Sequence, residues 1–495
     1  MSGQLSRDGI DDVYGGSLAL LTDLYQLSMA CGYWKAGTSE REAAFHLTFR
    51  RPPFDGGYAI AAGIAPALAF LRRLRFTADD VGFLATIPDA SGSPLFPPAF
   101  LDYLGDLRFT CTVDAIPEGS VVFAHEPIIR VIGPILQAQI VETALLTLVN
   151  FQTLIATKAS RVVASARGAA VVEFGLRRAQ GIDGGLSASR AAYLGGTAGT
   201  SSVLAGKLFG IPVKGTHAHS WVMAHGDELA AFRAYADALP GNTTFLVDTY
   251  DTLQGVRNAI TVGHELRARG HQLAGIRLDS GDLAHLSIEA RRMLDADGFG
   301  DAKITASNDL DEHLINSLHD QGARIDVWGI GTKLVTAFDQ PALGGVYKLG
   351  ATRQDGTWRA VLKLSEQPIK ISNPGILQVK RLRLGGALVG DILYDREAGF
   401  SGPTLHDIED PLRAPVSPTF DSAEDLLVTY LERGEPVRDL DSLEVCRARA
   451  ASDLAALSPR TRRFANPQPH PVGLDRHVHT QKLRLIAAAR GLSHA

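Results

Sequence analysis

The sequence has few cysteines, no large excess of either charge and no long apolar run. Its three cysteines, Cys31, Cys111 and Cys446, lie far apart and form no Cys-x-x-Cys pair. This spacing argues against a disulfide framework or a structural zinc site and is typical of a reducing compartment. The 49 Lys and Arg residues face 54 Asp and Glu residues, a net charge of −5, so no global basic field indicates a nucleic-acid partner.

No segment has the properties of a membrane span or a signal peptide. The longest apolar run, residues 58–71, has about 14 residues, whereas crossing a bilayer takes about 20. Residues 1–8 are polar and lack the apolar core of a signal peptide. We therefore expect a soluble, cytoplasmic protein without a membrane partner. With 495 residues, 45% of them hydrophobic, the chain can form two domains, or one barrel with a second lobe.

Short apolar runs alternate with helical patterns through residues 170–345. The runs are 171–174, 211–213, 245–248, 275–279, 304–307 and 325–329. One more short strand is expected near 193–197. The later run ends lie about 24 to 31 residues apart, the length of one βα unit. This rhythm predicts the α/β class, with an irregular (β/α) barrel of about seven units that carries the catalytic site. An open doubly wound sheet is the alternative.

The segments on either side of the barrel mix strands and helices. We expect residues 1–134 and 346–495 to form a second, α+β lobe, joined to the barrel by a long helix within 135–169. Pro134 opens that helical pattern, which runs to about Lys158. Further strands are expected at 45–49, 110–113, 120–123, 345–349, 358–364 and 378–384, and further helices at 423–435, 440–457 and 479–490.

Polar residues follow five consecutive barrel runs. They occupy residues 215–220, 248–251, 277–282, 307–309 and 329–333. The carboxyl ends of barrel strands hold the reacting groups, and glycines, hydroxyls and free backbone N–H groups there bind phosphate. Arg277 suits a carboxylate or phosphate, while Asp248 and Asp279 suit sugar hydroxyls or hydrated Mg²⁺. The pattern predicts a site for a phosphorylated sugar.

Each of these features also has a plainer interpretation. The Gly-x-Gly-Thr segment at 329–332 can be an ordinary turn, and Arg277 with Asp279 can be a structural ion pair. His217, His219 and His225 permit a metal hydrolase, although no carboxylate or cysteine pattern accompanies them. A non-catalytic barrel that senses phosphoribosyl compounds is a further alternative.

Specific motifs are spread over most of the chain, at residues 21–26, 54–58, 150–158, 173–178, 215–220, 277–282, 307–309, 329–334 and 466–474. In these segments the sequence resembles the nicotinate phosphoribosyltransferase family. The resemblance implies that nicotinate and phosphoribosyl pyrophosphate give nicotinate mononucleotide and pyrophosphate, the first step of NAD synthesis from nicotinate. It further implies ATP as a co-substrate, Mg²⁺ as a cofactor, and a homodimer with shared active sites.

The resemblance also implies residue roles. The Gly-Thr-x-Ala-His-Ser pattern places a phosphohistidine on His219 rather than His217, with Asp279 as a second catalytic residue. The nicotinate-binding residues are Phe174, Arg177, Thr216, Arg277 and, from a partner chain, Tyr25. The phosphoribosyl-binding residues are Ser307, Asn308, Gly329, Gly331 and Thr332. The Mg²⁺ ligands and the role of His217 stay open.

The closest alternative is the nicotinamide-using relative of this family. That relative carries an acid after a Gly-Thr pair, and the corresponding segment here is expected to be Gly196-Thr197-Ala198. An aspartate would accept a hydrogen bond from a carboxamide and repel a carboxylate. Neutral Ala198 therefore favours nicotinate.

Overall fold

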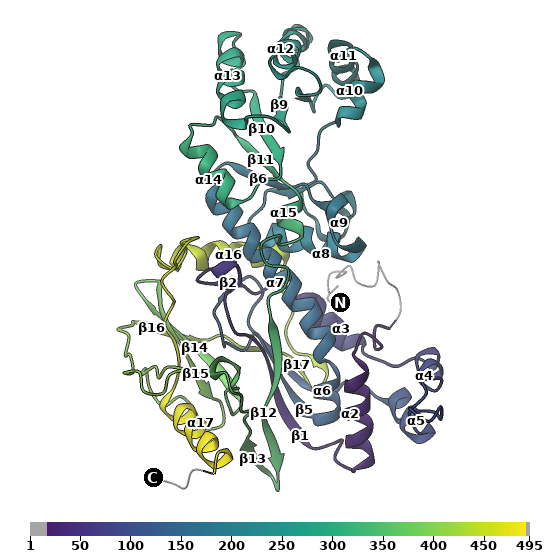
Figure 1. Cartoon of the computed structure of the whole chain (residues 1–495), viewed down its shortest axis with the longest axis vertical. Helices are drawn as coiled ribbons and strands as arrows, with labels where there is room; N and C mark the ends of the chain where they lie inside the picture. Colours follow the sequence, from purple (N-terminus) through teal and green to yellow (C-terminus); the bar gives the residue numbers. More distant parts are fainter. Residues whose placement is uncertain (1–16, 492–495) are drawn as a thin grey trace. The chain divides into compact units, whose positions relative to one another are not determined.

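The computed structural model describes residues 17–491 and divides the chain into two compact units (Figure 1). The central unit is Ile155–Pro341, and the terminal unit comprises the described residues of Met1–Leu154 and Ala342–Ala495. The division falls inside the long helix α7 (Glu142–Ser165).

Both ends of the chain contribute to the main sheet of the terminal unit. Its seven strands are all antiparallel, in the order β13 (Thr357–Ala360), β12 (Gly345–Gln354), β1 (Glu42–Phe49), β5 (Ile129–Pro134), β3 (Thr112–Ala115), β17 (Val428–Glu432) and β18 (Glu435–Pro436). The expected α+β lobe from the N- and C-terminal segments is thus confirmed. Leu47, Leu71 and Leu136 belong to one buried apolar cluster that joins this sheet to its helices.

Smaller elements complete the terminal unit. A four-stranded sheet has the order β16 (Ser422–Asp425), β14 (Leu377–Leu384), β15 (Ala387–Asp395) and β19 (Val472–Leu474), and β2 (Ala59–Ile60) pairs with β4 (Val121–Val122). The helices are α2 (Leu24–Lys35), α3 (Ile64–Arg73), α4 (Ala78–Leu84), α5 (Pro98–Asp106), α6 (Ile135–Ile140), α16 (Leu443–Ala456) and α17 (Arg476–Ala489).

Two local predictions in the terminal unit were wrong. The single helix expected from Ile135 is two helices, because α6 ends at Ile140 and Val141 separates it from α7. The helix expected at 423–435 is instead β16, β17 and β18. Arg433 and Gly434 have φ of +52° and +83°, as a tight hairpin turn requires, and pairing of β17 with β3 overrides the local helical pattern.

The central unit is built on a parallel sheet. Its strand order is β7 (Gly199–Thr200), β6 (Ala170–Glu173), β11 (Val327–Ile330), β10 (Lys303–Asn308), β9 (Gly275–Leu278) and β8 (Thr244–Leu246). A parallel bridge between Thr200 and Val213 adds a seventh strand position beside β7. The helices are α8 (Gly181–Leu194), α9 (Val203–Phe209), α10 (His219–His225), α11 (Glu228–Ala238), α12 (Thr252–Ala268), α13 (Leu283–Ala296), α14 (Glu312–Asp320) and α15 (Thr332–Val335).

This order is that of a (β/α) barrel, because segments consecutive in sequence are neighbours and β11 returns to pair with β6. Within the described residues, however, no strand ladder joins the Val213 position to β8, so the ring is open at one seam. The expected irregular barrel therefore has the predicted strand order but does not close. The additional short strand expected near 193–197 is β7, which begins two residues later because α8 continues to Leu194.

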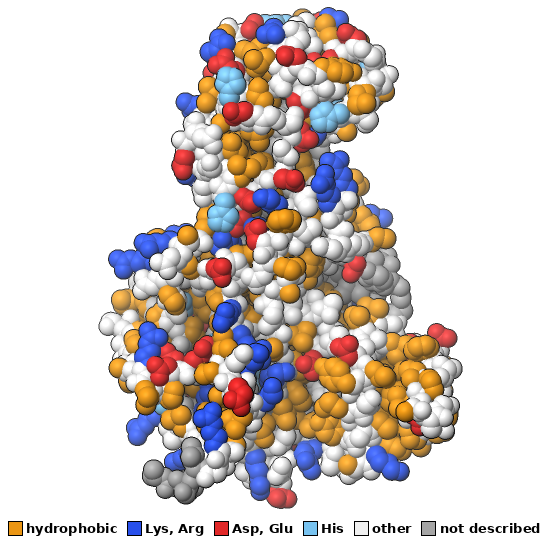
Figure 2. Space-filling model, in the orientation of Figure 1, with side chains coloured by type: hydrophobic (Ala, Val, Ile, Leu, Met, Phe, Trp, Pro, Cys, Tyr) orange, Lys and Arg blue, Asp and Glu red, His pale blue; other side chains and the backbone are white. Residues whose placement is uncertain are grey.

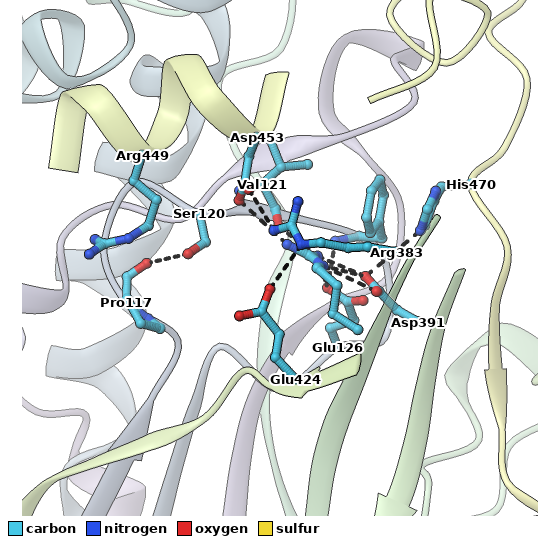
Figure 3. A network of polar contacts seen from close by, with 12 residues as sticks. Pro117, Ser120, Val121, Glu126, Arg383, Asp391, Glu424, Arg449, Asp453 and His470 are labelled. Carbon is cyan, nitrogen blue, oxygen red and sulfur yellow. Dashed lines mark hydrogen bonds and ion pairs between the residues drawn. The ribbon is translucent and has the colours of Figure 1, made fainter. Parts of the chain in front are cut away.

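A buried ionic network lies within the terminal unit (Figure 3). Arg381 of β14 contacts Asp391 at 2.7 Å and Asp453 at 3.5 Å, and its Nη2 donates to the Val121 carbonyl at 2.8 Å. Arg381 and Asp391 are both fully buried. The network joins two strands, a helix and an N-terminal segment, so it stabilises the packing of distant parts of the chain.

We expect Arg381→Ala to lower the free energy of unfolding by about 3–5 kcal/mol, because Asp391 would keep a buried charge without a partner. The control is Arg353→Ala, whose 2.6 Å ion pair with Glu42 is exposed on both sides, with an expected loss of about 1 kcal/mol or less. Chemical denaturation of both variants measures the difference. Equal losses would contradict this account of the network.

On the face drawn in Figure 2, basic and acidic side chains are interspersed, so that face carries no broad basic field. Among the described residues, no helix combines the length and apolar character that a membrane crossing needs.

Candidate active site

A cavity of about 490 Å³ opens at the carboxyl ends of the parallel strands in the central unit. All but two of the predicted site residues line it. These are Phe174, Arg177, Thr216, Arg277, Asp279, Ser307, Asn308, Gly329, Gly331 and Thr332. The two exceptions are Tyr25 and His219. The strand-end pattern in the sequence therefore identified one common site.

Phe174 forms a fixed wall of the cavity. Its N–H donates to the Ile330 carbonyl at 2.7 Å, and its ring packs against Gly329. A Cβ at Gly329 would lie 2.6 Å from the Phe174 ring, so only glycine leaves room for this packing. The preceding Glu173 is buried and accepts from Thr200 Oγ1 at 2.5 Å, which fixes the end of β6. A planar ligand can stack on the part of the ring that faces the cavity.

Arg277 supplies a positive charge to the same cavity. Its Nη1 donates to Thr216 Oγ1 at 2.6 Å, and its Nε is buried without a hydrogen-bond partner. Burial lowers the pKa of Arg277, an effect that the carboxylates of Asp279 and Asp248 oppose. Guanidinium groups stay protonated in proteins, so a half-buried one that lines a cavity favours an anionic ligand there.

Asp279 and Asn308 lie at the ends of the neighbouring strands β9 and β10. Ser307 Oγ donates to Asp279 Oδ1, and the amide oxygen of Asn308 accepts the Asp309 N–H at 2.8 Å. Asn308 has φ of +135°, a conformation that L-residues rarely adopt. Such backbone strain concentrates at ligand sites.

His219 begins α10 and does not line the cavity, although the adjacent Ala218 does. Its Nε2 lies 3.1 Å from Asp248 Oδ1. The other oxygen of Asp248 accepts from the Asp279 N–H at 3.0 Å and from Ser280 Oγ at 2.5 Å. The Asp248 side chain is 1% exposed and that of His219 is 38% exposed. A fixed carboxylate that accepts a hydrogen bond from Nε2–H keeps the ring proton of a neutral imidazole on Nε2. The other ring nitrogen, Nδ1, then carries no proton and can act as a nucleophile.

The contact of Asp248 with His219 was not predicted from the sequence, which suggested Asp248 only for sugar hydroxyls or Mg²⁺. The signal was present, because Asp248 ends the strand that follows the His219 segment along the chain. Consecutive strand ends are neighbours in a barrel, so the pairing could have been expected.

His217, whose role the sequence left open, is 7% exposed, and burial lowers its pKa to about 4. Its Nε2 accepts the Leu246 N–H at 3.2 Å. A neutral ring with this nitrogen engaged is less suited than His219 to act as a nucleophile. Within residues 17–491, no group of three or more His, Cys, Asp or Glu side chains is arranged to hold a metal ion.

The selectivity position expected at Ala198 was misplaced. Ala198 precedes β7 and does not line the cavity, whereas Ser201 follows β7 and does. The C-terminal end of a barrel strand faces the site, so Ser201 is the residue next to a ligand.

Tyr25 lies on α2 in the terminal unit and is not a lining residue of the cavity. It is 49% exposed. Burial of part of the ring, together with the nearby Glu142, raises its pKa to about 12, so the phenol is neutral.

Comparison with known proteins gives consistent matches over almost the whole chain. Residues 20–150, 169–374 and 403–482 match the models of the nicotinate phosphoribosyltransferase N-terminal domain, family and C-terminal domain. A nicotinate phosphoribosyltransferase of Bacillus subtilis (strain 168) is 44% identical over 477 residues, which cover 95% of each chain. The Homo sapiens protein of that name is 37% identical, covering 93% of this chain and 95% of its own.

A crystal structure of human nicotinic acid phosphoribosyltransferase superposes with a TM-score of 0.80 at 34% identity. The match covers 94% of this chain and 99% of that one. Sequence, fold and the strand-end cavity agree, and the chain belongs to the nicotinate phosphoribosyltransferase family.

Proposed function

We propose that this protein transfers the phosphoribosyl group from phosphoribosyl pyrophosphate to nicotinate, which gives nicotinate mononucleotide and pyrophosphate, the first step of NAD synthesis from nicotinate. The observation that carries the proposal is the half-buried Arg277, which lines one cavity together with an aromatic wall and three hydroxyl- or glycine-rich strand ends. Cys31, Cys111 and Cys446 form no disulfide, which supports a reducing, cytoplasmic setting.

Nicotinate binding uses the aromatic and cationic side of the cavity. The pyridine ring stacks on Phe174, and its carboxylate pairs with Arg277, which Thr216 holds through the 2.6 Å hydrogen bond. Arg177 lines the same cavity and adds positive charge. Charge pairing of this kind favours a carboxylate over a neutral carboxamide.

Phosphoribosyl binding uses the ends of β10 and β11. Ser307, Asn308 and Thr332 offer polar side chains, and Gly329 and Gly331 let the ligand approach the backbone. Asp279 is a lining carboxylate, and only one of its oxygens accepts from Ser307. It therefore fits a hydrated Mg²⁺, which when bound neutralises charge on the pyrophosphate.

ATP coupling is assigned to His219. Its Nδ1 attacks the γ-phosphorus of ATP, the bond from that phosphorus to the bridging oxygen breaks, and ADP leaves. Asp248 holds the Nε2 proton and stabilises the positive charge that forms on the ring. Water later takes the phosphoryl group from the histidine, and this hydrolysis drives nucleotide synthesis forward.

The direct test supplies phosphoribosyl pyrophosphate with nicotinate, nicotinamide or quinolinate, each with and without ATP, and measures mononucleotide. We expect synthesis with nicotinate that ATP stimulates. A preference for nicotinamide would contradict the role of Arg277, and no product with any base would favour the non-catalytic alternative.

Ser201 provides a test of selectivity. We expect Ser201→Asp to lower kcat/KM for nicotinate by about tenfold or more, because a carboxylate would face the carboxylate of the substrate. The nicotinate-to-nicotinamide ratio of kcat/KM should fall as well. Ala198→Asp, three residues away and outside the cavity, is the matched control and should leave that ratio unchanged. If the nicotinate-to-nicotinamide ratio changed only in the Ala198→Asp variant, Ala198 and not Ser201 would be the selectivity residue.

We further propose that the active site is shared within a homodimer, with Tyr25 of each chain stacking on nicotinate bound to its partner. Tyr25 is exposed on α2 beside exposed Leu21, Leu24 and Met29, an apolar surface suited to a protein contact. Tyr25→Ala and His219→Ala chains are each expected to lack ATP-stimulated synthesis, and mixing them should restore it at about one site per heterodimer. Chains that exchange freely but regain no activity would contradict a shared site.

A further inference from the structure

The seam of the open barrel separates the two residues of the His219–Asp248 pair. On one side, the Lys214 N–H donates to the Thr200 carbonyl at 2.9 Å, which fixes residues 212–214 as the seventh strand position. On the other side, β8 pairs only with β9 in the sheet. The Leu246 N–H of this edge strand would require an acceptor from the missing ladder.

The imidazole of His217 provides that acceptor. His217 follows the seventh strand position by a few residues, and the Leu246 N–H donates to its Nε2 at 3.2 Å. The ring also packs against aromatic side chains, with centroid distances of 5.9 Å to Phe232, 4.9 Å to Tyr235 and 6.3 Å to Phe245. One side chain thus supplies both a ladder hydrogen bond and apolar contact across the seam.

This contact requires a neutral ring, because a protonated Nε2 cannot accept a hydrogen bond. Burial disfavours the charged form of His217. The charged and titratable groups that face the ring are Arg277 of β9, His219 of α10 and Tyr235 of α11, and positive charge on Arg277 or His219 opposes protonation further. The ring therefore accepts from Leu246 throughout the neutral pH range.

The seam carries two links in register. His217 and His219 are two residues apart on one side, and Leu246 and Asp248 are two residues apart on the other. The first link is the hydrogen bond from Leu246 to His217, and the second is the 3.1 Å contact of His219 with Asp248. Without the first link, Asp248 would still be held by the Asp279 N–H and Ser280 Oγ, but the hydrogen bond that fixes the His219 segment against β8 across the seam would be lost.

We propose that His217 is a positioning residue that closes the barrel seam and sets the geometry of the His219–Asp248 pair for phosphoryl transfer. This inference rests on the proposed phosphorylation of His219. His217 occupies the x position of the Gly-Thr-x-Ala-His-Ser segment, and the proposal gives the residue at that position a role.

The test compares three substitutions at this position. His217→Gln keeps an acceptor near the place of Nε2, whereas His217→Phe keeps the ring and His217→Met keeps the bulk, both without an acceptor. His225→Phe, at an exposed position of α10, is the control. The readouts are the initial rate of phosphate transfer from γ-labelled ATP to His219, the Kd of nicotinate, and amide hydrogen exchange in a peptide covering residues 243–248.

We expect the Phe and Met variants to label about tenfold more slowly or worse, because they leave the buried Leu246 N–H unpaired. Exchange in the 243–248 peptide should rise in both, while the Kd of nicotinate changes by less than about threefold. The Gln variant should restore most of the labelling rate and protection. Phe and Met variants that label and exchange like the wild type, or a Gln variant that is no better than Phe, would overturn the proposal.

Hydrogen exchange keeps the two proposals separable. If the wild type takes up no label, the phosphohistidine assignment fails, and His217 then has no phosphoryl transfer to support. If the wild type is labelled and the variants lose protection without losing labelling rate, His217 closes the seam but does not position His219, and the positioning role is refuted.

Discussion

His219→Ala is expected to take up no phosphate from γ-labelled ATP and to lose the stimulation of nucleotide synthesis by ATP. Alanine has no nucleophile, and Asp248 then has no imidazole to orient. Slow synthesis without ATP should remain, because Arg277, Phe174 and the phosphate-binding strand ends do not depend on the histidine ring. Label on the wild-type protein should be acid-labile and base-stable, as phosphohistidine is.

The matched control is His225→Gln, which alters another exposed histidine of α10 and should be labelled like the wild type. Asp248→Asn removes the carboxylate but leaves the nucleophile, so its labelling should be slower by about 10²-fold without being abolished. Label that persists in His219→Ala would show that another residue is the phosphoryl acceptor.

The location of the site could be predicted from sequence because barrel topology brings distant strand ends together. Runs of apolar residues marked most of the strands, and the polar residues after them converge on one cavity. The motif positions added roles that residue types alone do not give. Arg277 alone, for example, is compatible with a structural ion pair, and only its place in the lining of the cavity argues for an anionic ligand.

The remaining features depend on contacts that local sequence does not encode. Whether Ala198 or Ser201 faces the site follows from the two-residue extent of β7, which no periodicity can define. The motif at 150–158 contains Lys158, which is fully buried and contacts Glu312 at 2.6 Å. This end of the motif therefore stabilises the central unit. The barrel is open because no ladder forms between the Val213 position and β8. The role proposed for His217 depends on this open seam.

The second large effect is expected for Arg277→Ala, which should lower kcat/KM for nicotinate by about 30-fold or more. Removing the guanidinium leaves the substrate carboxylate without its charged partner in a partly buried site, which costs about 2–5 kcal/mol, and about 1.4 kcal/mol corresponds to each tenfold change in rate. Thr216 also loses the 2.6 Å hydrogen bond from Arg277. Steady-state kinetics with nicotinate measures the loss.

Nicotinamide is the internal control for this variant, because it keeps the pyridine ring for Phe174 but has no carboxylate. The loss of kcat/KM should therefore be several times smaller with nicotinamide, and the preference for nicotinate should narrow. Arg277→Gln retains a planar donor that can reach Thr216 but has no charge, so it separates the hydrogen bond from the charge. If the positive charge of Arg277 recognises the substrate carboxylate, Arg277→Gln should lose as much kcat/KM with nicotinate as Arg277→Ala does. Equal losses of kcat/KM with nicotinate and nicotinamide would instead mean that Arg277 acts by holding the cavity wall.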